Sequence, residues 1–99
     1  MSYRITWTKR ALLSFEVNLE YLGTEWTLAV TNEFLDEVEH ALQTIEGKPF
    51  LYSIHNKTKK IHKCNINKRI SLYYRIDNKS TISLITFWNT TQDPAKLKL

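Results

Sequence analysis

The stretch that most constrains the fold is residues 69–76, where apolar and polar side chains alternate without a break. One set is apolar and points to one face of a β-strand: Ile70, Leu72, Tyr74 and Ile76. The other set mixes cations with an aromatic ring and points to the opposite face: Arg69, Ser71, Tyr73 and Arg75. An apolar face needs another layer to bury it, whereas cations and rings suit phosphates and bases. The pattern predicts a sheet with one covered face and one open, cationic face.

Two further strands flank this one, at roughly Lys60–Ile66 and Ser80–Trp88, with Asn- and Asp-containing turns between them. The last strand is apolar on both faces from Leu84 onward, which is typical of a strand inside a sheet. We therefore expect it beside an N-terminal strand at residues 3–7. If the strand at 60–66 buries its apolar residues, His62 points inward and Lys63 outward. A slip of one residue, or a bulge, would reverse these faces.

Two amphipathic helices are expected before the three strands. The first follows Thr8, a suitable N-cap, and runs to about residue 22, with Gly23 just after its end. The second spans about residues 25–45 and takes Thr24 as its cap. Because the link between the helices is so short, they must form an antiparallel hairpin.

The element order is then β-α-α-β-β-β, with residues 47–59 as a loop. Ninety-nine residues suit one domain, covering 1–99. The expected fold class is α+β, with two layers. The helical hairpin would pack on a mostly antiparallel, four-stranded sheet.

Charge is segregated along the chain, beneath a formal net charge of +4. Residues 16–46 hold eight acids and no Lys or Arg, whereas residues 57–79 hold eight Lys or Arg and one acid, Asp77. A basic half on a small domain favours a polyanionic partner, such as nucleic acid or a very acidic protein. The alternative is a solvated surface that only keeps the protein in solution.

Several function classes are not expected. The single cysteine, Cys64, excludes an internal disulfide and fits a reducing compartment. No apolar run approaches the roughly 20 residues of a membrane span, and the N-terminus lacks signal-peptide features. We therefore expect a cytoplasmic protein with no membrane partner. His62 and Cys64 fall short of a zinc pattern, so no metal is expected, and two glycines supply no phosphate loop for a small-molecule cofactor.

The candidate target-binding residues are the cations and the tyrosine expected on the open face: Lys60, Lys63, Arg69, Tyr73 and Arg75. Ordinary cross-strand pairing is an equally good interpretation of Arg69, Tyr73 and Arg75. His62 has a side chain suited to acid–base chemistry, but a packed histidine is the favoured interpretation.

Several segments, in this order and spacing, resemble the RelE/ParE superfamily of bacterial toxins. The segments are Tyr3–Ala11, Tyr21-Leu22 with Trp26, Pro49–Tyr52, Leu72–Ile76, Phe87–Asn89 and Gln92–Pro94. The resemblance implies a toxin of a type II toxin–antitoxin system, of the plasmid stabilisation type. It also implies growth inhibition and a cognate antitoxin protein as partner.

The resemblance implies two different targets. RelE-type members cleave messenger RNA in the ribosomal A site, and ParE-type members act on DNA gyrase. Aligned on Tyr74, the third-strand arginine of RelE-type toxins falls on Ser71, and their second-strand lysines fall on His62 and Cys64. Since serine cannot neutralise a phosphorane, the ParE-like interpretation is favoured, with the toxin binding its target rather than cutting it.

Two alternatives stay open at this point. The first is a ribosome-dependent mRNA endoribonuclease of the RelE type that uses a replacement set of catalytic residues: Lys63, Arg69, Tyr73 and Arg75. The second is an inert member of the superfamily that binds only its antitoxin or RNA.

Overall fold

The computed structural model describes residues 2–99, including the backbone but not the side chain of Glu25. The helices and strands, in chain order, are β1 Arg4–Trp7, α1 Lys9–Glu25, α2 Leu28–Gly47, β2 Ser53–Asn56, β3 Ile61–Asn65, β4 Ile70–Ile76 and β5 Thr81–Asn89. A short 3-10 helix, η1 Pro94–Lys96, lies in the C-terminal tail. None of the helices within residues 2–99 is both long and apolar enough to cross a membrane.

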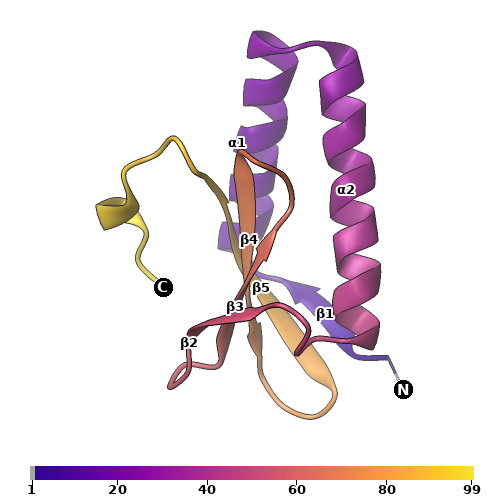
Figure 1. The fold of residues 1–99 in the computed structure, drawn as a ribbon, viewed down its shortest axis with the longest axis vertical. Coiled ribbons are helices and arrows are strands. Elements are labelled where there is room, and N and C mark those ends of the chain that lie inside the picture. Colours follow the sequence, from indigo (N-terminus) through magenta and orange to yellow (C-terminus); the bar gives the residue numbers. More distant parts are fainter. Residues whose placement is uncertain (1) are drawn as a thin grey trace.

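The strands form one mixed sheet in the order β1-β5-β4-β3-β2 (Figure 1). β1 pairs with β5 in parallel, and the other neighbours are antiparallel. The predicted α+β fold is confirmed, and so is the position of the last strand beside the first. The difference is a fifth strand, β2, within the stretch expected to be a loop. Its residues are mostly exposed and a bulge follows Ile54, so no apolar alternation marks it in the sequence.

The helical hairpin covers the apolar face of the sheet with an aromatic core. The ring of Phe87 on β5 lies 5.6 Å from that of Trp7 and 5.4 Å from that of Phe15, and Phe15 lies 5.7 Å from Phe34 of α2. The predicted cap at Thr8 is present, because its Oγ1 accepts a hydrogen bond from the Ala11 amide. The same hydroxyl donates to the Leu84 carbonyl at 2.7 Å, which ties the start of α1 to β5.

The helices meet three residues later than the sequence predicts. Thr24 does not cap the second helix, because it lies inside α1 and its hydroxyl donates to the Glu20 carbonyl at 3.1 Å. Gly23 is likewise a helical residue and not a helix end. Thr27 is the cap of α2, where its Oγ1 accepts from the Val30 amide. The link between the helices therefore consists of Trp26 and Thr27, three residues later than expected.

Candidate target-binding face

The inward orientation of the β3 histidine is the one observed. His62 is buried on the helical side of the sheet, and Lys63 is half-exposed on the other side. The His62 ring stacks on Tyr74 at a centroid distance of 5.4 Å, and its Nδ1 lies 2.9 Å from the Tyr52 carbonyl oxygen. Because a carbonyl oxygen can only accept, Nδ1 carries a proton. These contacts describe a packed histidine whose orientation is fixed.

The outer face of the sheet is not the open cationic surface that the alternation predicts. Its central residue, Tyr73, is only 4 % exposed, and Ser71, Thr86 and Ile61 are also buried. Tyr73 pairs with Lys63 on one side and with Thr86 on the other. Burial raises the pKa of the Tyr73 hydroxyl above its ordinary value.

Two long side chains hold the end of the C-terminal tail. Arg10, at the start of α1, donates a hydrogen bond to the Lys98 carbonyl, and the Lys59 Nζ lies 2.5 Å from the Leu99 carbonyl oxygen. Since Arg10 lies at the start of α1 and Lys59 lies in the β2–β3 turn, long side chains from two distant parts of the fold meet at the last two residues of the tail. Figure 1 shows the tail on the side of the sheet away from α2. Leu97 and Leu99 make the tail apolar enough to dock on its own chain or on another, but no sequence pattern indicates the bonds to Arg10 and Lys59.

The alternation predicts that Arg69 points to the outer face, but it does not. Its guanidinium carbon lies 3.9 Å from the centroid of the Trp26 ring, at the tip of the helical hairpin. The alternation fails because Arg69 belongs to a turn and β4 begins only at Ile70. In this turn the Asn67 side-chain oxygen accepts hydrogen bonds from the amides of Arg69 and Ile70, at 2.8 and 2.9 Å.

Arg75 is exposed but paired. Its Nε lies 2.7 Å from Asp77 Oδ1, and the Ser83 hydroxyl donates to Asp77 Oδ2 at 2.5 Å. Partial burial acts to raise the pKa of Asp77, but the bonds from Ser83 and Arg75 and the charge of Arg75 outweigh it. The pKa of this carboxyl is therefore lowered, which keeps it ionised beside the arginine.

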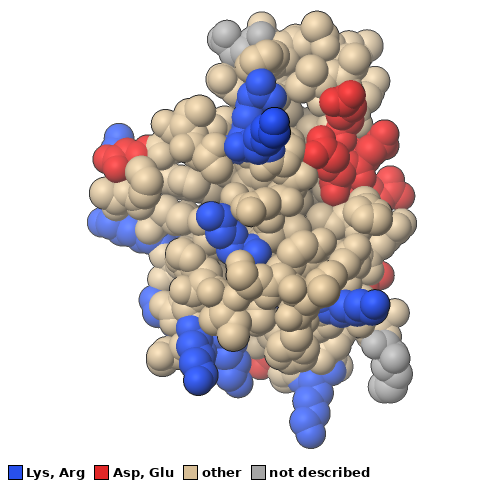
Figure 2. Space-filling view, viewed as in Figure 1, with Lys and Arg blue, Asp and Glu red and all other residues tan. Residues whose placement is uncertain are grey.

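The five predicted target-binding residues thus occupy three places. Lys63, Tyr73 and Arg75 belong to the outer side of β3 and β4. Arg69 lies at the hairpin tip, and Lys60 lies in the turn before β3, where its side chain borders a cavity on the other side of the sheet. Figure 2 shows most of the visible acidic side chains gathered over α2, with Lys and Arg spread over the rest of this view.

One residue of the outer face was missed in the sequence. The ring of His55, on β2, packs edge-on against Tyr73 at 4.9 Å. Only the assignment of residues 53–56 as a strand would have indicated this contact. Nowhere among the side chains that the structure describes do three His, Cys, Asp or Glu groups gather to hold a metal ion.

Comparison of the sequence with protein-family models finds no match, and comparison with curated proteins finds none either. Solved structures do match. A chain of the chromosomal ParDE TA (toxin–antitoxin) system from P. aeruginosa has a TM-score of 0.72 and 8% identity, over 89% of this chain and 96% of that one. The E. coli DinJ-YafQ toxin-antitoxin complex gives 0.65 and 4%, over 92% and 96%.

A copper-bound mutant toxin from Helicobacter pylori is also similar, with a TM-score of 0.54 and 18% identity over 92% of this chain and 97% of that one. At these identities the likeness concerns the arrangement of helices and strands. The chain therefore has the fold of the RelE/ParE superfamily toxins, as the sequence resemblance implies.

Proposed function

We propose that this protein is the toxin of a type II toxin–antitoxin pair, and that it acts by binding a macromolecular target such as DNA gyrase without cutting RNA. The fold and its likeness to chains of toxin–antitoxin systems support the first part. The second part rests on one observation, which is the dispersal of the side chains that a ribonuclease would need.

RNA cleavage at a 2′-hydroxyl needs a base, an acid and cations that converge on one phosphate. Here Arg69 is held against Trp26, and the charge of Arg75 is shared with Asp77. Tyr73 is buried, and burial raises the pKa of its hydroxyl, which makes it a weaker acid than a free tyrosine. Of the replacement set, Lys63 alone has a side chain that is partly exposed and that forms neither an ion pair nor a cation–ring contact among the described residues.

The positions that correspond to cations of RelE-type toxins are also buried. The Ser71 hydroxyl is buried and donates to Asn65 Oδ1 at 2.9 Å. Cys64 is buried, and burial raises the pKa of its thiol. With His62 fixed by Tyr52 and Tyr74, none of these side chains is free to contact a phosphate. This supports a toxin that binds its target and is not a nuclease.

The protein can still bind a target through its exposed positive charges. Exposed lysines occupy the turns around the sheet: Lys57, Lys59, Lys60, Lys68 and Lys79. They favour an acidic surface on the target and an acidic antitoxin that neutralises the toxin.

The test is inhibition of gyrase supercoiling by the purified protein, run beside induced expression in a bacterial host. We expect the wild type to slow growth and inhibit supercoiling. We expect Lys63→Glu to weaken inhibition several-fold, and Lys48→Glu, an equal charge change at the end of α2, to leave it unchanged. Unaffected growth would favour the inert alternative. Untouched gyrase with cleaved ribosome-bound message would overturn the proposal in favour of a RelE-type ribonuclease.

A further inference from the structure

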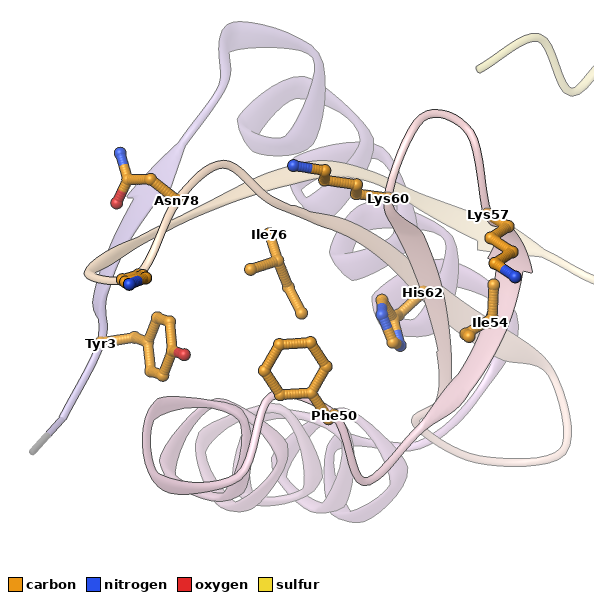
Figure 3. A pocket seen from close by; sticks show the side chains of 9 residues that line it. Tyr3, Phe50, Ile54, Lys57, Lys60, His62, Ile76 and Asn78 are labelled. Carbon is orange, nitrogen blue, oxygen red and sulfur yellow. The ribbon is translucent and has the colours of Figure 1, made fainter.

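A cavity of about 370 Å³ lies where the helical layer ends before the sheet does. α2 stops at Gly47, and the chain turns back over the buried Pro49, whose carbonyl accepts a 2.6 Å hydrogen bond from the Tyr74 hydroxyl. The apolar face of the sheet continues past this point to Ile76. Figure 3 shows that Phe50 faces Ile76 across this space.

The interior of the cavity is apolar and aromatic. Tyr3, Phe50, Ile54 and Ile76 line it, together with the ring of His62. Phe50 meets the His62 ring edge-on at 6.0 Å, and the His62 Nδ1 is already bonded to the Tyr52 carbonyl. The walls therefore offer a ligand mainly apolar contact. The volume is at the small end of the roughly 300–1,000 Å³ range of ligand pockets, which suits one large side chain.

The rim of the cavity is cationic. Lys57 and Lys60 come from the β2–β3 turn and Lys79 from the β4–β5 turn, and none of the three forms an ion pair with a described side chain. Lys60 adopts a left-handed backbone conformation, with φ of 59°, which a glycine would adopt without strain. A lysine at this strained turn position places a charge beside the cavity.

Three large apolar side chains at or beside the cavity are exposed. Phe50 is 68 % exposed, Leu51 63 % and Ile54 61 %. Grouped exposed side chains of this size mark protein interaction sites. Since three lysines surround them, charge complementarity favours an acidic partner and disfavours a basic one.

We propose that this cavity, lined by Phe50, Ile54 and Ile76 and rimmed by Lys57, Lys60 and Lys79, binds an acidic segment of the antitoxin that inserts one bulky apolar side chain. The inference rests on the proposed function for the identity of the partner. The apolar side chain fills the interior, and flanking carboxylates contact the lysines.

The probe is a five-residue peptide, acetyl-Glu-Asp-Phe-Asp-Glu-amide, titrated into the ¹⁵N-labelled protein and followed by NMR. We expect saturable shifts at the amides of Ile54, Lys60 and His62. Replacing the central Phe by Ala should weaken binding about tenfold or more, because the side chain no longer fills the cavity. A peptide with lysines in place of its acids should not bind.

Two pairs of protein variants locate the site. Lys57→Glu combined with Lys60→Glu should abolish binding, whereas Lys9→Glu combined with Lys98→Glu makes the same charge change elsewhere and should not. Phe50→Ala should weaken binding about tenfold, and Leu13→Ala, an exposed apolar residue of α1, should have no effect. All four positions of the charge variants are exposed, so folding is preserved.

The absence of binding, equal binding of the Ala peptide, or binding that survives the Lys57 and Lys60 changes would overturn the inference. Growth inhibition measured in parallel separates it from the proposed function. If the protein inhibits growth but does not bind the peptide, the proposed cavity site is wrong and the toxin assignment stands. If the protein binds the peptide at the cavity but leaves growth unaffected, the toxin assignment is wrong and the cavity remains a site for acidic peptides.

Discussion

The guanidinium of Arg69 lies over the ring of Trp26, 3.9 Å from its centroid, and this contact joins the turn before β4 to the tip of the helical hairpin. The two residues come from different layers of the fold. A cation held over an indole ring stabilises a protein by about 0.5–2 kcal/mol. Arg69 therefore has a structural role, and it lies away from the outer face, where a RelE-type ribonuclease would need a catalytic arginine.

Arg69→Ala should lower the free energy of unfolding by about 1 kcal/mol, because the cation–ring contact is lost. Trp26→Leu should cost a similar amount, and a double-mutant cycle should give a coupling of about 0.5–1 kcal/mol. Urea unfolding of the wild type, the two single variants and the double variant measures this coupling. Lys68→Ala, the exposed neighbour, is the matched control. A coupling near zero would mean that the contact contributes nothing to the hairpin.

Phe34→Ala should be strongly destabilising, by about 3–5 kcal/mol, since Phe34 is fully buried against Phe15 and Phe87. Leu35→Ala, on the exposed side of the same helix, should cost far less. Chemical denaturation followed by tryptophan fluorescence compares the two. Similar losses for both variants would contradict the described packing of α2 on the sheet.

Removal of residues 94–99 should expose the outer face. We expect faster amide exchange at Ile61 and Tyr73 and a stability loss of about 1–3 kcal/mol, because apolar surface returns to water. Lys59→Met removes only the hydrogen bond to the Leu99 carbonyl and should cost about 1 kcal/mol or less. If exchange at Tyr73 is unchanged in the shortened chain, the tail is not what covers it.

The pKa of Asp77 is lower in the folded protein than in the unfolded chain, so its contribution to stability is present above the ordinary aspartate pKa of about 3.9. That contribution is lost as the pH falls through the lowered value. Asp77→Asn should therefore be less stable than the wild type at pH 7, by about 1 kcal/mol, and the difference should shrink towards pH 2. Thermal unfolding across this range measures it, with Asp36→Asn as control. A difference independent of pH would contradict the Arg75–Asp77 pairing.

Most of the fold could be predicted because the local sequence patterns of its main strands and helices agree with their tertiary packing. The alternation from Ile70 to Ile76 fixed the covered face, and Thr8 marked the start of α1. The doubly apolar end of β5 indicated a strand with neighbours on both sides. The inward orientation of His62 could be predicted from the burial of Cys64, which lies two residues away on the same strand. Apart from the Thr8 cap, which is a local signal, these signals depend on burial, and burial produces a pattern of apolar residues in the sequence.

The missed features depend on contacts between distant segments. Thr24 and Thr27 are equally good caps by local criteria, and the choice between them accompanies the packing of Trp26 under Arg69. β2 carries no alternation because it is an exposed edge strand. The outer face looked open because nothing in the tail's composition shows that its carbonyls bond to Arg10 and Lys59.

We propose that the outer face of the sheet contains no catalytic site for RNA. The most direct measurement is the integrity of a message bound in the A site of purified ribosomes after addition of the protein. We predict that the message stays full length at protein concentrations that inhibit gyrase. Cleavage at a defined position, abolished by Arg75→Ala or Tyr73→Phe in variants that still fold, would contradict it.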